Sequence, residues 1–372
     1  MRTPRARFLN VQPYGGGFLL SDPYGISAEV VVTPQMLLLL SLMDGERSEE
    51  DIRAEFLRRT GTILTEEEFR EILSFLDRGG YLLSEEFLRR LEEKKRRMLG
   101  AGVKEPFHAG SAYPEKPEDL RLFLEKNLQA EERESPLGIL VPHMDLRVAA
   151  PTYGRVYGRI ARKPETILVM GVAHYVHETP LSVCPLDFRT PLGTLKVDRE
   201  IVDRMKSLFD HDILHDILSY EKEHSIEFQT IFLKHLFPEA RVVPLIVSWG
   251  DEDLLRKIAE KITRAIEDRD VMLVASVDLS HVGRKFGDER SYDPSFRDRE
   301  YLNLLSALDS EASFRLLASD QNRTRIDGQF TNFVFLEVLK NLGASKGKEI
   351  DYSSHYEEAT DSVVTYAGMT FL

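Results

Sequence analysis

The chain has 372 residues, of which 42% are hydrophobic, so it is long enough for two domains and can bury a sizeable core. Its net charge of −13 argues against nucleic acid as a partner, because phosphate binding needs a basic surface. The single cysteine excludes intrachain disulfides and cysteine-based zinc clusters, and no apolar run approaches the length of a membrane span. With no secretory pattern at the N-terminus, we expect a cytoplasmic protein that does not bind membranes.

The first hundred residues predict a small domain made of a hairpin, three helices, a short strand or wing, and a charged helix. In chain order these elements are expected at 17–23 with 28–32, at 33–43, 48–59 and 65–79, at 81–83, and at 85–98. Ser48 is a good N-cap residue, and Thr65 stands in capping-box spacing with Glu68. Residues 101–104 are expected to be a linker to a second domain.

Strand, three helices and wing form the winged-helix pattern, and the segment 42–48 resembles the small PqqD-like modules that recognise peptides. Residues 1–100 are therefore expected to form a winged-helix or PqqD-like module. Its third helix carries five acidic residues against two arginines, which is the wrong charge balance for reading DNA. We expect the module to dock a peptide or a protein partner, and a purely structural appendage is the open alternative.

From about Phe107 to the end, strand-like and helical segments alternate. This alternation predicts the α/β class, with a mostly parallel sheet covered by helices on both faces. The helices are expected at 117–128, 151–160, 199–208, 226–236, 251–267, 297–308 and 330–342, and the last strand at 362–372.

Several of the apolar, strand-like segments end in a histidine or in an acidic residue with a histidine. Three of them lead directly to His143, to His174 and to Asp278 with His281, and Glu223–His224 opens a helix before a fourth strand. Ligands of open α/β sheets bind beyond the carboxyl ends of the strands, so these groups are expected around one point. Metal binding is the chemistry that best explains such a gathering of imidazoles and carboxylates.

Ordered motifs occur between residue 107 and the end of the chain. They are His108–Pro114, Val141–His143, Gly171–His174, Arg189–Leu195, Glu223–Glu227, Ser276–His281 and Asp361–Gly368. Together they resemble the Memo family, called AmmeMemoRadiSam system protein B in prokaryotes. The resemblance implies a Memo-like α/β domain over residues 107–372. Memo proteins are similar in fold to class III extradiol dioxygenases, so a metal site at the carboxyl edge of the sheet is also implied.

The resemblance implies His143 and His174 as metal ligands. It implies Asp327 as the third ligand, because the family's usual Cys-Gly is replaced here by Asp327-Gly328 and the dioxygenases place a carboxylate in that role. A second departure is Pro142–Leu146, which reads Pro-His-Met-Asp-Leu where the family usually has Pro-His-Ala-Gly-Tyr. A turn or helix-cap role for Asp327 is an equal alternative, and the two roles are compatible.

Further residues are expected to handle protons or to orient the ligands. His281 matches the position of the acid–base histidine of the dioxygenases, and His224 would be a second such imidazole in the same crevice. Asp278, near His281, and Glu223 and Glu227, near His224, are expected to fix histidine tautomers. A structural hydrogen bond or helix cap is the alternative for Asp278 and the favoured interpretation for Glu227. His108 is expected to line the same crevice.

Two imidazoles and one carboxylate favour a divalent metal, Fe(II) first, with Zn, Mn or Cu as alternatives. The resulting hypothesis is a non-haem Fe(II)-dependent, dioxygenase-like oxidoreductase, and a hydrolase using a metal-bound water is a further option. The rival is a non-catalytic adaptor that binds a peptide or protein. Family association implies AMMECR1-like and radical-SAM proteins as partners, and an acidic α/β protein of this size is often a homodimer.

Overall fold

The computed structural model describes residues 3–128 and 132–372, and the chain divides into two compact units, residues 1–100 and 101–372. The division falls at the end of helix α4 (Glu85–Ala101), which is directly followed by strand β4 (Val103–Lys104). The segment expected to be a linker is thus ordered secondary structure. In the described part of the chain, no helix combines the length and the hydropathy needed to cross a bilayer.

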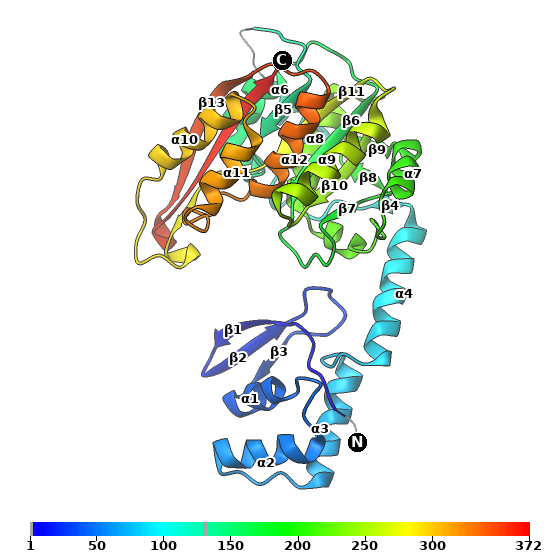
Figure 1. Cartoon of the computed structure of the whole chain (residues 1–372), viewed down its shortest axis with the longest axis vertical. Coiled ribbons are helices and arrows are strands. Elements are labelled where there is room, and N and C mark those ends of the chain that lie inside the picture. Colours follow the sequence, from blue (N-terminus) through cyan, green and yellow to red (C-terminus); the bar gives the residue numbers. More distant parts are fainter. Residues whose placement is uncertain (1–2, 129–131) are drawn as a thin grey trace. The chain divides into compact units, whose positions relative to one another are not determined.

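The first unit is a three-stranded antiparallel sheet followed by helices (Figure 1). Its elements are β1 (Asn10–Tyr14), β2 (Gly17–Ser21), β3 (Val30–Val32), α1 (Pro34–Leu42), α2 (Glu49–Thr60), α3 (Glu66–Gly79) and α4. Ser48 and Thr65 both close capping boxes, so the expected helix starts at these two residues are confirmed. The strand expected at 81–83 is reduced to a single bridge between Leu82 and Ala6, and β1 was not expected.

A buried ion pair, Arg7–Asp22, ties the N-terminal segment to the turn between β2 and β3. The two side chains are 3% and 1% exposed and lie 2.7 Å apart. Arg7 also donates to Ser27 Oγ (2.8 Å), and Asp22 accepts from the backbone N–H groups of Tyr24 and Ile26. Burial raises the pKa of Asp22, but the Arg7 hydrogen bond and the backbone donors together lower it by a larger amount. The pKa of Asp22 therefore lies below its usual range.

The large sheet of the second unit is eleven-stranded and mixed, with a parallel centre, antiparallel pairs toward both margins and a short parallel pair that includes β4 at one end. In addition to β4, its strands are β5 (Gly138–Val141), β6 (Thr166–Val172), β7 (Leu181–Val183), β8 (Asp187–Thr190), β9 (Gly193–Val197), β10 (Arg241–Val247), β11 (Val271–Ser276), β12 (His281–Gly283), β13 (Gly347–Glu357) and β14 (Ser362–Phe371). They are ordered β12-β14-β5-β11-β6-β10-β9-β8-β4, with β13 beside β14 and β7 beside β10. The pairs β5–β11, β11–β6, β6–β10 and β10–β9 are parallel, which confirms the predicted α/β class.

Helices surround this sheet (Figure 1). They are α5 (Pro117–Asn127), α6 (Leu146–Tyr157), α7 (Arg199–Leu208), α8 (His224–Leu236), α9 (Glu252–Ile266), α10 (Ser295–Ser306), α11 (Ser310–Ala318) and α12 (Gln329–Asn341), with short 3-10 turns at Ile217–Glu221, Arg284–Phe286 and Glu358–Thr360. Helix α6 begins five residues before the expected start at Pro151, because Asp145 caps it and the proline lies inside it. Helix α11 and strand β13 were not predicted, the latter because it is a polar strand without an apolar run.

Helices α8 and α12 pack on opposite faces of the sheet. Leu273 of β11 pairs with both Gly138 of β5 and Leu168 of β6, so these residues lie on the same face of the sheet. Successive residues of a strand alternate between the faces, and Gly171 comes three residues after Leu168, so Gly171 lies on the opposite face from Gly138. A Cβ atom at Gly138 would contact α12, whereas one at Gly171 would lie 2.4 Å from Ser225 Oγ of α8. The absence of a side chain at Gly171 therefore allows the first turn of α8 to reach the end of β6.

Replacing Asp22 by Asn should lower the free energy of unfolding of the first unit by about 3 kcal/mol, since the buried Arg7 guanidinium would lose its counter-charge. Because the folded pKa is lowered, the stabilisation by Asp22 is complete above its ordinary value of 3.8 and is lost as pH falls through the folded value. Amide hydrogen exchange over residues 1–100 measures both effects. Glu66→Gln, which removes an exposed pair with Arg70, is the control and should change little; equal stability of the two variants would contradict the prediction.

Gly171→Ala should destabilise the second unit by about 1–3 kcal/mol, because the added methyl group would overlap Ser225 of α8. Trp249 is the only tryptophan of the chain and lies in this unit, so its fluorescence during denaturant unfolding reports on this unit alone. Glu239→Gln is the control, since Glu239 is an exposed residue of the same unit, and it should leave the transition unchanged. An unchanged Trp249 transition in Gly171→Ala would show that α8 does not approach β6 as described.

Candidate metal centre

Five side chains that carry chemistry meet at the carboxyl edge of the central strands. The neighbouring parallel strands β5, β11 and β6 are each followed, two residues after their last residue, by His143, Asp278 and His174 respectively. His224 is the first residue of α8, and Asp327 lies in the turn before α12. The two helices on opposite faces therefore bring their N-terminal ends to the edge where open α/β sheets bind ligands.

His143 is the buried imidazole of this group. Its backbone N–H donates to Asp278 Oδ1 (2.9 Å), and its Nδ1 lies 3.0 Å from the Ser276 carbonyl oxygen. A carbonyl only accepts, so Nδ1 carries a proton, and Nε2 lies 2.8 Å from Asp327 Oδ2. Burial lowers the pKa of His143, but the charges of Asp278 and Asp327 raise it to about 10. These carboxylates favour positive charge at Nε2, whether from a proton or from a metal ion.

His174 is oriented by Glu223, the N-cap residue of α8. The His174 Nδ1 lies 2.8 Å from Glu223 Oε1, and the His174 backbone N–H donates to Oε2 (3.1 Å). Glu223 is fully buried, which raises its pKa, but the contact with His174 lowers it to about 2. The ionised carboxylate holds the proton on Nδ1, so Nε2 of His174 is left for the centre, 4.0 Å from Asp327 Oδ2.

His224 completes a group of three imidazoles. Its ring centroid is 4.2 Å from that of His174 and 5.0 Å from that of His143. One nitrogen from each ring lies within 4.8 Å of the other two, a spacing at which a metal ion can be held. Burial, with His143 and His174 nearby, lowers the pKa of His224 to about 2, so this ring is neutral. The His174 and His224 side chains are 29% and 27% exposed, so the group is open to solvent.

Asp327 has one oxygen engaged and one without a donor. Its Oδ1 accepts from the Asp278 backbone N–H (3.1 Å). Its Oδ2 is buried, and among the described residues no hydrogen bond of acceptable angle reaches it, despite the 2.8 Å approach of His143 Nε2. The N-cap of α12 is Gly328, so the Asp327 side chain does not cap this helix. A buried anionic oxygen that faces imidazole nitrogens without a donor fits a cation ligand better than a cap.

His281 lies beside this group. Its Nδ1 is 2.9 Å from the Leu279 carbonyl oxygen and 3.0 Å from that of Arg325, so its Nε2 is the free nitrogen. The ring packs edge-on against Phe286. Asp278 is buried, which raises its pKa, and the nearby His143 and His281 act in the opposite direction. His281 thus follows Asp278 by three residues and contacts the backbone two residues before Asp327, and it lies outside the three-imidazole group.

Glu227 of α8 binds the opening segment of the second unit, to which His108 belongs. The Glu227 carboxylate accepts from Lys104 Nζ, from the backbone N–H groups of Phe107 and His108, and from the Tyr113 hydroxyl. The His108 Nε2 lies 2.9 Å from the Lys222 carbonyl oxygen, and its ring centroid is 5.9 Å from that of His224. Glu227 therefore reaches the imidazole group only through His108, and its contacts match the structural hydrogen bonds favoured for it from the sequence.

The partner of Glu223 was not found from the sequence, which indicated a carboxylate that orients its neighbour His224. The observed partner is His174, 49 residues earlier in the chain, while Glu223 Oε1 is 3.7 Å from His224 Nδ1. A sequence pattern identifies the carboxylate but not the residue that tertiary structure brings to it.

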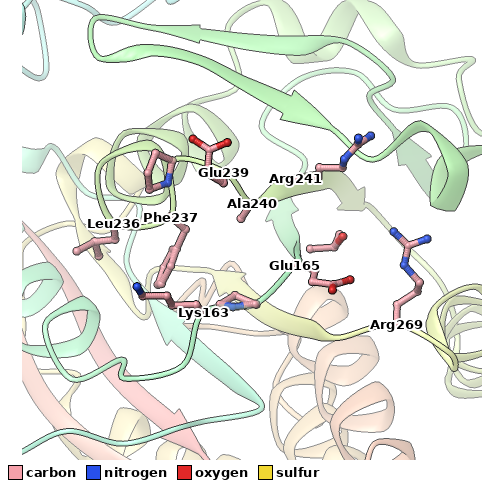
Figure 2. Close-up of a pocket in the computed structure, with 11 residues that line it drawn as sticks. Lys163, Glu165, Leu236, Phe237, Glu239, Ala240, Arg241 and Arg269 are labelled. Carbon is pink, nitrogen blue, oxygen red and sulfur yellow. The ribbon is translucent and has the colours of Figure 1, made fainter.

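A cavity of about 490 Å³ lies at the opposite edge of the sheet (Figure 2). It is lined by the starts of β6 and β10 and by the end of α8, with Lys163, Phe237, Arg241 and Arg269 among its residues. No histidine lines it, and it lies at the amino ends of the parallel strands. Because open α/β sheets bind ligands at the carboxyl ends, we place the chemistry at the histidine edge.

Residues 104–370 match the family model described as Memo-like protein. A MEMO1 family protein of Aquifex aeolicus (strain VF5) is 55% identical over 371 residues, which cover 99% of each chain. A MEMO1 family protein of Thermus thermophilus is 31% identical, covering 87% of this chain and 98% of the relative. The solved structure of an uncharacterized protein from Escherichia coli K12 aligns with a TM-score of 0.36 and 12% identity, over 63% of this chain and 99% of that one.

Glu223→Gln should weaken metal binding about 10- to 100-fold, because the neutral amide no longer holds the proton on His174 Nδ1. Calorimetric titration of Zn²⁺ into metal-free protein measures this change. Glu239→Gln is the control, since Glu239 lines the cavity at the opposite edge of the sheet. If both variants bound zinc as the unaltered protein does, Glu223 would not orient a ligand.

Proposed function

Because the chain belongs to the Memo-like family, we propose that its second unit is a metal-dependent oxidoreductase of the non-haem Fe(II), dioxygenase-like type. The observation that carries this proposal is the buried Asp327 Oδ2, which no well-aligned donor of the described residues reaches and which lies 2.8 Å from Nε2 of His143 and 4.0 Å from Nε2 of His174. Two imidazoles and one carboxylate are the donor set of non-haem Fe(II) oxygenases, and Zn, Mn and Cu are the alternative ions.

Among the described residues, no cysteine belongs to the proposed metal site. Cys184 is buried, and burial raises the pKa of its thiol to about 12. Imidazole and carboxylate donors favour Fe(II), Mn(II) or Zn(II) over Cu(I), which prefers sulfur. When bound, such an ion would supply Lewis acidity and, as iron, one-electron chemistry.

His224 and His281 are the proposed proton-handling residues. His224 is partly exposed and lies against His174, so a substrate that enters from solvent could contact both rings. His281 keeps its Nδ1 proton on two carbonyl oxygens and leaves Nε2 free to accept a proton near Asp278. The two rings would serve the exposed side of the centre and the carboxylate side respectively.

A non-catalytic adaptor is the second candidate function, and one feature of the first unit supports it. All five residues of β1 are exposed, and β1 pairs only with β2 among the described strands, so its other edge is open to strand addition by a peptide. A peptide or protein partner at this edge, and the AMMECR1-like and radical-SAM partners suggested by family association, remain proposals.

Protein purified without oxygen should carry about one iron ion per chain, and His143→Ala and Asp327→Ala should each lose it, since each removes a proposed ligand. Elemental analysis of the purified chains gives the metal content. His235→Ala is the control, because His235 lies on the last turn of α8, away from the centre, and iron should be retained.

The other outcomes separate the alternatives. Tightly bound zinc without oxygen consumption would favour the hydrolase over the oxidoreductase. Unaltered protein without metal, or metal indifferent to both substitutions, would overturn the metal proposal and favour the adaptor.

A further inference from the structure

Gln229 is a fully buried amide on α8, five residues after His224. Its Nε2 donates to the carbonyl oxygen of Pro142 (2.8 Å) and to Ser276 Oγ (2.7 Å). Its Oε1 accepts from the Tyr157 hydroxyl (2.9 Å). A carbonyl only accepts, so the orientation of the amide is determined, and both Nε2 protons are used.

The two acceptors of the Gln229 amide adjoin the buried ligand His143. Pro142 precedes His143 in the chain, and the carbonyl of Ser276 holds the Nδ1 proton of His143 (3.0 Å). On the other side of His143, the Tyr153 hydroxyl donates to the Met144 carbonyl oxygen (3.0 Å). The end of β5 is thus held by side chains of α8 and α6.

We propose that Gln229 is a positioning residue of the metal centre. Its amide joins the ends of β5 and β11 to α8, and so holds Nε2 of His143 toward Asp327. The same helix orients His174 through Glu223, so α8 sets the direction of both imidazole ligands. The inference rests on the proposed metal site and adds Gln229, which lies two residues beyond the segment Glu223–Glu227.

The test replaces Gln229 by Met, which has a similar volume and no donor. Both acceptors would lose their partner, and the His143 ring would lose its fixed direction. Titration with Co²⁺ should show an affinity reduced about 10- to 100-fold, the usual effect of removing a residue that orients a metal ligand. The visible spectrum of bound Co²⁺ should also be altered, even at saturating Co²⁺. A general loss of stability would not change the spectrum of the saturated protein.

Tyr157→Phe is the matched control, because it removes the donor to Oε1 and leaves both Nε2 hydrogen bonds in place. It should keep the Co²⁺ spectrum of the unaltered protein. Equal spectra and affinities for Gln229→Met and Tyr157→Phe would overturn the inference.

A second readout needs no metal. Nitrogen-15 NMR should show a slowly exchanging Nδ1–H of His143, assigned by its loss in His143→Ala, which exchanges faster in Gln229→Met than in Tyr157→Phe. Equal exchange in these two variants would overturn the role of Gln229 even if the unaltered protein bound no Co²⁺. Failure of Co²⁺ binding by the unaltered protein would instead count against the proposed function alone.

Discussion

Buried carboxylates at one edge of the sheet impose the main constraint on the second unit. Glu223, Asp278 and Asp327 lie among imidazole rings with few other donors, and an unpaired buried charge is costly. Glu223 meets this constraint with the Nδ1 proton of His174, while Asp278 and Asp327 raise the pKa of His143. The edge as a whole therefore favours an additional positive charge, and a divalent ion between the nitrogens and Asp327 would provide it.

Helix α8 connects this constraint to the fold. Gly171 lets the first turn of the helix approach β6, and that turn carries Glu223 and His224 to the edge. One turn further on, Gln229 binds the ends of β5 and β11. Side chains of one largely buried helix therefore set the orientation of the proposed ligands, as expected for a centre that must hold its donors in fixed positions.

Gly328 determines how the turn before α12 packs, and so where the proposed ligand Asp327 lies. A Cβ atom at Gly328 would lie 2.6 Å from Asn332 Nδ2 and 2.8 Å from Val277, so this position requires glycine for the turn to lie beside Asp278. A carboxylate at position 327 is a harder donor than a thiolate, which is why iron is proposed here before copper.

Local patterns were sufficient for part of this protein. Alternating strands and helices indicated the α/β class, and the residues after two apolar strands, His143 and His174, were found at the sheet edge because parallel strands end on the same side. Ser48 and Thr65 marked helix starts because a capping box involves only neighbouring residues. Such features depend on the order of residues along the chain.

Other features were decided by contacts between distant segments. Glu223 contacts His174, and Glu227 binds the opening segment of the second unit. Gln229 donates to the carbonyl of Pro142, the residue before His143, although the two lie 87 residues apart in the chain. The polar strand β13 forms because it pairs with the edge of β14, whereas its own sequence has no apolar run that predicts a strand. A side chain's hydrogen-bonding capacity is a property of the residue, but its partner is selected only when packing brings the donor and acceptor together.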